Sequence, residues 1–209
     1  MKEKLILLAT IILFTCCAPK KFNKKWLKEK SPKTFKARFE TTQGIFDIEA
    51  KRAWSPKGVD RLYQLIKYNY YNDIAIFRVV PKFVAQFGIH NDSLINNSWG
   101  DKGIDDEPVI LKNDFMTISF ARSTVKTRSN QIFINLKSNN QLDIADYSGV
   151  VGFPAVAKVI AGSENVLNFY DKYGDKLGIQ QGPINKFGNK FLREKYPKVD
   201  YILKAYFIK

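Results

Sequence analysis

The chain has 209 residues, of which 45% are hydrophobic and 14% aromatic, so it is long and apolar enough to fold around a core and is not a disordered segment. Its formal net charge is +14, and residues 20–38 hold eight lysines and one arginine against Glu29, a net charge of +8. The excess is concentrated in one arm, which favours attraction to anionic lipids or envelope polymers over a nucleic-acid-binding domain.

Residues 1–15 have the pattern of a signal peptide. Lys2 and Lys4 precede a mostly apolar run, Leu5 to Phe14, which is too short to span a bilayer as a helix. A threonine and then Cys16 follow this run, and the next residue is also a cysteine. This pattern resembles a bacterial lipoprotein signal, in which the first mature cysteine carries the lipid, and Cys16 fits that position best. An ordinary secretory signal or an uncleaved anchor is the alternative.

Residues 16–34 are then expected to form the lipidated cysteine and a basic tether, because Pro19, Pro32 and many lysines argue against a packed element. One acyl chain with lysines beside it provides two membrane-attachment signals. No acidic cluster follows Cys16, so we expect an anchor that faces the periplasm of a bacterial cell envelope. The two cysteines are both near the N-terminus, so the remaining chain needs no disulfide and has no thiol nucleophile.

The first elements predicted after the tether are a β-hairpin and a helix. Alternating apolar runs at 35–40 and 45–50 flank a turn that ends at Gly44. Ser55 is a good N-cap, and Pro56 is a good first helical residue. Apolar residues then recur at helical spacing, at Val59, Leu62, Leu65 and Ile66.

The rest of the chain is predicted to be mainly β. Strand-like runs occur at 74–80, 83–87, 115–121, 131–136, 149–160 and in the C-terminal VDYILKAYFI. Residues 90–108 are expected to be a loop that carries His90 at the surface, and residues 174–190 a glycine-rich excursion. A short second helix opens at Ser163. About eight strands with two helices and no repeats favour a closed β-barrel.

Several motifs, in order, resemble the cyclophilin-type peptidyl-prolyl isomerases over about residues 36–209, and we assign residues 35–209 to this domain. FRVVPKFVAQFG at 77–88 is similar to the central motif of the family. ISFA at 118–121, followed ten residues later by Gln131 and then Ile-Phe-Ile, is similar to its second motif, and Leu142-Asp143 to its third. TTQG at 41–44, NYYN at 69–72 and KYPKVDYI at 195–202 add weaker matches, the last to an exported bacterial branch.

The resemblance implies an eight-stranded antiparallel barrel capped by two helices, with a substrate groove on its outer face because side chains fill the barrel interior. It implies that the chain isomerises X–Pro bonds of exported polypeptides without a cofactor or metal. We expect a monomer that does not bind nucleic acid. The residues that it assigns to catalysis are Arg78, Phe83, Gln86 and Phe133. Those that it assigns to substrate binding are Val84, Ala121, Arg122, Gln131, Leu142 and Phe153.

The residue types suit the reaction. The X–Pro barrier of about 18–20 kcal/mol comes from lost amide resonance, so a catalyst grips the proline and stabilises the twisted bond. Arg78 carries a charged guanidinium with several N–H donors, and the aromatic side chains form an apolar slot.

Some positions depart from the family pattern. Gln141 stands where many members have a tryptophan that shapes cyclosporin recognition, so we expect weak inhibition by cyclosporin. Phe153 stands where many have histidine, and Val156-Ala157 where they have Phe-Gly. These departures leave open an alternative, a module that binds proline-containing segments without turnover. A third possibility, compatible with the first, is that the basic arm binds polyanions.

Overall fold

The computed structural model describes residues 22–146 and 148–209. The predicted signal peptide and the lipidation site Cys16 lie outside these ranges. Within them, nine strands form one sheet in the order β3-β9-β1-β2-β8-β6-β7-β5-β4, and every neighbouring pair is antiparallel. No helix of the described residues is long and apolar enough to cross a membrane.

The strands are β1 Thr34–Thr41, β2 Gly44–Lys51, β3 Ile74–Ala75, β4 Arg78–Val80, β5 Val84–Phe87, β6 Thr117–Phe120, β7 Ile132–Asn135, β8 Ala155–Ala161 and β9 Tyr201–Ile208. The α-helices are α1 Pro56–Lys67, α2 Ser93–Gly100, α3 Gln141–Ile144, α4 Ser163–Leu167, α5 Gly174–Gly178 and α6 Gln181–Lys195. Two 3₁₀ helices, η1 Lys24–Lys28 and η2 Arg52–Trp54, complete the described elements.

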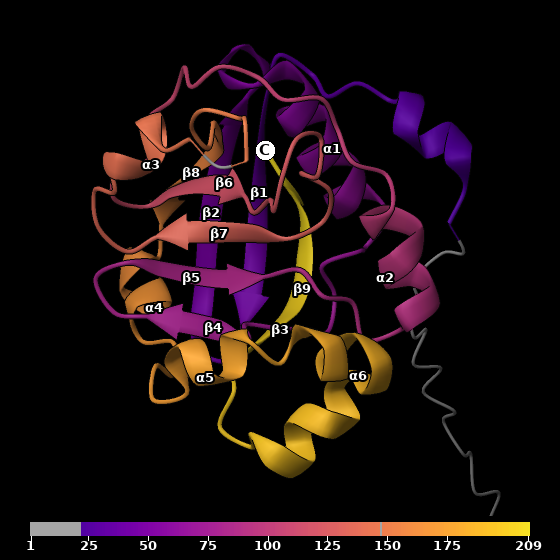
Figure 1. The fold of residues 1–209 in the computed structure, drawn as a ribbon, viewed down its shortest axis with the longest axis vertical. Helices are drawn as coiled ribbons and strands as arrows, with labels where there is room; N and C mark the ends of the chain where they lie inside the picture. The colour runs from indigo at the N-terminus through magenta and orange to yellow at the C-terminus, as the bar shows by residue number, and fades with distance from the viewer. Residues whose placement is uncertain (1–21, 147) are drawn as a thin grey trace, which may run out of the picture.

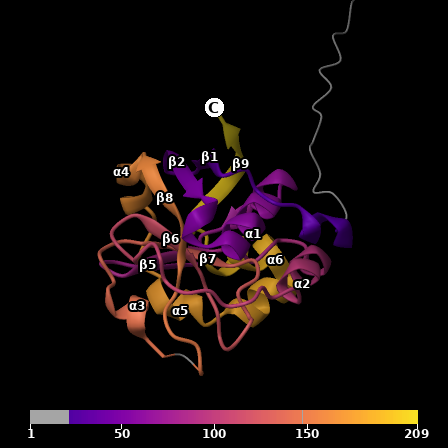
Figure 2. The ribbon, with the colours of Figure 1, turned by 90° about the horizontal axis from the view of Figure 1, so that it is seen from above.

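The sheet curls into an open half-barrel. Strands β4, β5, β7 and β6 run across β1, β2 and β9 (Figure 1), and the turned view places α3 and α5 on the side opposite β1 and β2 (Figure 2). The mainly-β, antiparallel prediction is confirmed, but the closed eight-stranded barrel with two helices is wrong. Strands β3 and β4 lie at the two ends of the sheet and do not pair with each other in the described chain. Between β3 and β4, Ile76 donates its N–H to the carbonyl oxygen of Asp200 at 2.8 Å, so this segment prolongs the pairing of β3 with β9 and does not join β3 to β4.

The main core follows the predicted hairpin and first helix. Alternate residues of β1 are buried, as a strand with one covered face requires. Phe39 and Phe46, paired across the hairpin, stack with ring centroids 4.9 Å apart. All four predicted apolar positions of α1 are buried against this core, at most 1% exposed.

Two segments predicted to lack structure are helical. Residues 90–108 contain α2, whose N-cap Asp92 accepts hydrogen bonds from the N–H groups of Leu94 and Ile95. The predicted excursion at 174–190 forms α5 and most of α6, which bury Leu177 and Ile184 in a second apolar cluster. Its helical period is interrupted where α6 bends, because Gly188 has a φ of 59°.

The expectation that residues 16–34 lack a packed element is wrong for residues 22–34. The ring of Trp26, on η1, stacks on Tyr68 with centroids 3.8 Å apart and packs against the main core. Ser31 donates its N–H to Asp60 on α1 at 2.9 Å. The lysines of this segment are exposed, while Trp26 packs against the core. The basic composition therefore gave no indication that this short helical turn packs against the domain.

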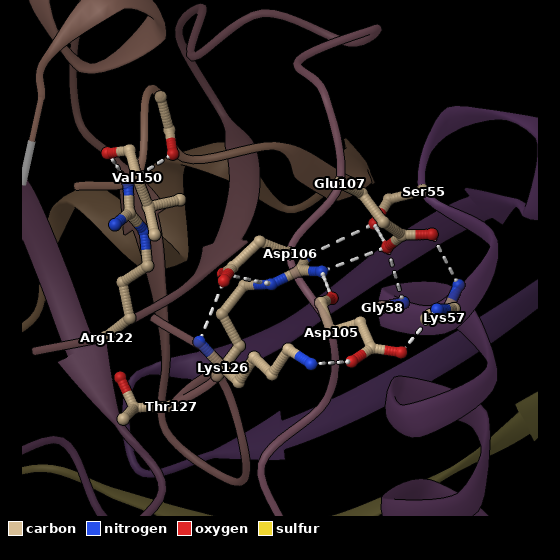
Figure 3. A network of polar contacts seen from close by, with 12 residues as sticks. Ser55, Lys57, Gly58, Asp105, Asp106, Glu107, Arg122, Lys126, Thr127 and Val150 are labelled. Atoms are coloured by element: carbon tan, nitrogen blue, oxygen red, sulfur yellow. Dashed lines mark hydrogen bonds and ion pairs between the residues drawn. The ribbon is translucent and has the colours of Figure 1, made fainter. Parts of the chain in front are cut away.

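The first turn of α1 is capped from a distant loop. Ser55 is the N-cap residue, but its hydroxyl caps no N–H and instead donates to the carboxylate of Glu107. That carboxylate accepts the N–H groups of Lys57 at 2.8 Å and Gly58 at 3.1 Å. Glu107 also pairs with the buried guanidinium of Arg128 at 3.1 Å (Figure 3). The loop before β6 is thereby tied to the start of α1.

Candidate active site

Strand register brings three of the predicted catalytic residues into one row. Arg78 on β4 is paired directly with Gln86 on β5, and Gln86 is paired with Phe133 on β7. Directly paired residues project from the same face of a sheet. A tight turn joins β4 to β5, with Phe83 donating its N–H to Val80 at 3.0 Å, and this turn places the Phe83 ring beside the guanidinium of Arg78, 5.6 Å away.

An apolar floor lies next to this row. Val84, Phe133 and Phe153 are at most 9% exposed and form a cluster of their own, separate from the main core. The rings of Phe133 and Phe153 meet edge to face at 6.0 Å, an arrangement favoured by aromatic pairs. Leu142, Ala121 and Phe83 pack at its edge, and the whole lines a cavity of about 570 Å³ on the surface of the half-barrel.

A relay of hydrogen bonds crosses the cavity from α5 to the start of α6. Arg78 donates from Nε to Asp175 at 2.6 Å and from Nη1 to Gln86 Oε1 at 3.1 Å. Gln86 Nε2 donates to Gln131 Oε1, and Gln131 Nε2 to Gln181 Oε1, each at 3.0 Å. Arginine can only donate, so it fixes the orientation of each amide along the relay.

The side chain of Arg122 closes the opposite rim. Its guanidinium lies over the Phe153 ring at 4.3 Å and donates from Nη2 to the carbonyl oxygen of Val150 at 2.9 Å and to that of Gly152. The side chain holds the segment that follows α3 against the aromatic floor.

A buried amide network supports the floor and was not foreseen from the sequence. Asn113 donates to the carboxylate of Asp143 and to the carbonyl of Phe153, both at 2.8 Å. Asn139 donates to the carbonyl of Phe83 at 2.9 Å and to Asn135 at 2.8 Å. Both asparagines are fully buried, so each bond replaces one lost to water. The Leu142-Asp143 motif thus places the apolar residue at the cavity and the carboxylate behind it.

All ten residues predicted for the site line this one cavity; they are Arg78, Phe83, Val84, Gln86, Ala121, Arg122, Gln131, Phe133, Leu142 and Phe153. Their catalytic and binding roles stay predictions. Sequence reasoning missed Asp175 and Gln181, which the predicted excursion brings to the site.

His90 does not lie at the surface as expected. It is 4% exposed and packs beside Tyr70, with ring centroids 5.2 Å apart. Its Nδ1 accepts the N–H of Asp92 at 2.9 Å, and burial lowers the pKa of its imidazole below the usual 6.5. His90 does not line the cavity, so we assign it a structural role at the start of α2.

An antiparallel half-barrel with an arginine, a glutamine and a phenylalanine in one row above an apolar cavity defines a protein of the cyclophilin class. Residues 36–181 match the family model described as cyclophilin type peptidyl-prolyl cis-trans isomerase/CLD, so the chain belongs to this family and is a cyclophilin-type isomerase.

Curated relatives and solved structures agree with this assignment. A peptidyl-prolyl cis-trans isomerase-like 1 of Aspergillus oryzae is 30% identical over 108 residues, which are 50% of this chain and 67% of the relative. A peptidyl-prolyl cis-trans isomerase of Acinetobacter baylyi is 27% identical over 128 residues, 61% of this chain and 67% of the relative. A cyclophilin-type isomerase structure from Cryptosporidium parvum has the same fold, with a TM-score of 0.56, 21% identity and coverage of 84% of this chain and 98% of that chain.

Proposed function

We propose that the chain isomerises X–Pro bonds non-covalently, with Arg78 as the fixed donor and the aromatic floor as the proline pocket. The observation that carries this proposal is the row of Arg78, Gln86 and Phe133 beside that floor. The proline ring lies on Phe133 and Leu142, while the guanidinium reaches the prolyl nitrogen or the adjacent carbonyl as the bond twists. A donor held in place before the reaction stabilises the twisted amide without reorganising water.

The reaction requires no proton transfer from the enzyme. The twisted amide loses its resonance, and the prolyl nitrogen becomes basic, so a hydrogen bond to it is stronger in the transition state than in the ground state. Every residue that lines the cavity is apolar, an amide, a hydroxyl or an arginine, so no carboxyl or imidazole side chain of the described residues lines it. Stabilisation of about 1.4 kcal/mol specific to the twisted form gives each tenfold gain in rate.

A refolding assay tests this function. A model protein whose refolding is limited by proline isomerisation is diluted from denaturant with the full chain present at one-hundredth of its concentration. We expect the slow phase to accelerate in proportion to added enzyme. Acceleration only at equimolar amounts, or binding of the unfolded protein without acceleration, would favour the alternative, a module that binds proline-containing segments without turnover. The departures from the family pattern at Gln141 and Val156 motivate this alternative.

We also propose that the chain acts on exported proteins from a lipid anchor at Cys16 in a bacterial envelope. Support comes from the sequence: a short apolar run, a following cysteine and a basic arm. Expressed in a bacterium fed labelled palmitate, the full chain is expected to take up label and sediment with membranes. Cys16→Ser should abolish both, and the matched Cys17→Ser variant should keep both. Label lost only in Cys17→Ser would assign the lipid to Cys17 instead. No label in the unmutated chain would show that the chain is not lipid-anchored.

A further inference from the structure

We propose that Asp175, on α5, is a positioning residue that aims the guanidinium of Arg78 into the cavity. This inference rests on the proposed function, in which Arg78 is the donor. Asp175 lies 97 residues from Arg78 in the sequence, and its Oδ1 is 2.6 Å from Nε.

The contacts of Arg78 divide its three nitrogen atoms between two tasks. Nε is bound by Asp175, and Nη1 donates to Gln86 at 3.1 Å. Nη2 has no hydrogen-bond partner among the described residues, and Arg78 lines the cavity. Because a guanidinium is planar and rigid, fixing two of its nitrogens fixes the direction of the third. The pair of contacts therefore leaves one N–H₂ group for substrate in a set orientation.

Helix α5 is itself held against Arg78. A Cβ placed on Gly178 would lie 3.0 Å from Cδ and 3.1 Å from Cγ of Arg78, so the helix backbone rests on the aliphatic stem of that side chain. The neighbouring Leu177 is 1% exposed in the second apolar cluster. Asp175 thus extends from an anchored turn, although its own side chain is 66% exposed. The aliphatic part of the Arg78 side chain packs on Gly178, and its guanidinium is bound by Asp175.

This exposure separates a positioning role from a stabilising one. An ion pair with an exposed partner contributes little to folding, because water screens the charges. Holding a catalytic donor in its productive orientation, by contrast, affects the transition state directly, since a misdirected group must first be ordered. Asp175 also places a negative charge next to the donor. If that charge mainly weakened the field of Arg78, removing it would raise the rate, and the two possibilities make opposite predictions.

The test compares Asp175→Ala, Asp175→Glu and the control Lys176→Ala in the full chain, with isomerisation of a proline tetrapeptide as the readout. Lys176 is the exposed neighbour on α5 and has no ion pair among the described residues. We expect Asp175→Ala to lower kcat about three- to tenfold with little change in KM. Glutamate should restore most of kcat, because its carboxylate reaches the same N–H. The melting temperatures of all three variants should match that of the unmutated chain.

The ¹H–¹⁵N NMR signal of Arg78 Nε, assigned with Arg78→Lys, gives a readout independent of activity. It should be slow to exchange in the unmutated chain, and should exchange rapidly in Asp175→Ala and be restored in Asp175→Glu. An unchanged or increased kcat in Asp175→Ala, while Arg78→Ala is inactive, would overturn the positioning role alone. If Arg78→Ala keeps full activity, the proposed function fails instead, whatever the Nε signal shows.

Discussion

Replacing Arg78 by alanine is expected to lower kcat/KM for a proline tetrapeptide by about 10²–10³, the loss typical of removing one preorganised donor. The guanidinium is bound at two nitrogens and adjoins the apolar floor, so alanine removes a donor that is already held in place. Arg78→Lys keeps the charge but not the planar, multiple donors, and we expect it to lose at least about tenfold. Exchange of the cis and trans signals by NMR measures both.

The fold is expected to survive this change. The Arg78 side chain is 27% exposed and lies at the edge strand β4, outside the main core. Lys204→Ala, which removes an exposed cation from β9, is the matched control and should keep full activity. Full activity in a folded Arg78→Ala variant would refute the mechanism and leave the family assignment intact.

Replacing Glu107 by alanine is expected to destabilise the protein by about 3–5 kcal/mol, the range for breaking a buried ion pair by removing one partner. The variant leaves the guanidinium of Arg128, whose side chain is 1% exposed, with only one carboxylate among the described residues, that of Asp106, which lies 4.0 Å from its Nε. It also uncaps the N–H groups of Lys57 and Gly58. Asp105→Ala is the control, because its side chain is 49% exposed and water screens its ion pairs with Lys57 and Lys126, so we expect a much smaller loss of stability. Urea denaturation measures both, and equal losses would show that Glu107 does not hold the loop before β6 against α1.

The contribution of Glu107 should depend on pH. Burial alone would raise the pKa of this carboxyl, but hydrogen bonds from Ser55, from the Lys57 and Gly58 N–H groups and from Arg128 outweigh it and hold the pKa below the usual 4.5. A carboxyl with a lowered folded-state pKa stabilises fully above its unfolded value and loses this contribution as pH falls through the folded value. The difference in unfolding free energy between the unmutated chain and Glu107→Gln should therefore be constant above about pH 5.5 and shrink below 4.5.

The residues that line the cavity were predictable from the family resemblance, because its motifs are local or are brought together by strand register. FRVVPKFVAQFG contains a complete hairpin, so Arg78 and Gln86 face each other by pairing alone. Asp175 carried no such signal, since it is one exposed carboxylate in a glycine-containing stretch and acts through a contact 97 residues away. The spacing of Leu177, Ile184 and Leu192, seven and then eight residues, is a helical signal that the bend at Gly188 disguised.

The fold shows the same division between local and distant causes. Pro56 and the apolar period after it fixed α1, whereas its cap comes from Glu107, about fifty residues further on, which no local pattern announces. Asp92 is a readable N-cap for α2, but the helix has one buried residue, Trp99, and so little periodicity. The lysines around Trp26 have the composition of a flexible tether, but the ring of Trp26 stacks on Tyr68, a contact that composition does not reveal.

The most direct test of the central claim combines turnover with its location in one NMR sample. The full ¹⁵N-labelled chain is mixed with an excess of an alanine–proline tetrapeptide, and exchange between the cis and trans peptide signals is recorded alongside the backbone amide signals of the enzyme. We expect cis–trans exchange to be far faster than the unaided process, which takes tens to hundreds of seconds. The largest chemical-shift changes are expected at the amides of Gln86, Phe133 and Leu142. Peptide binding at these residues without faster exchange would make the protein a proline-segment binder. Fast exchange with shifts elsewhere would place the active site outside this cavity.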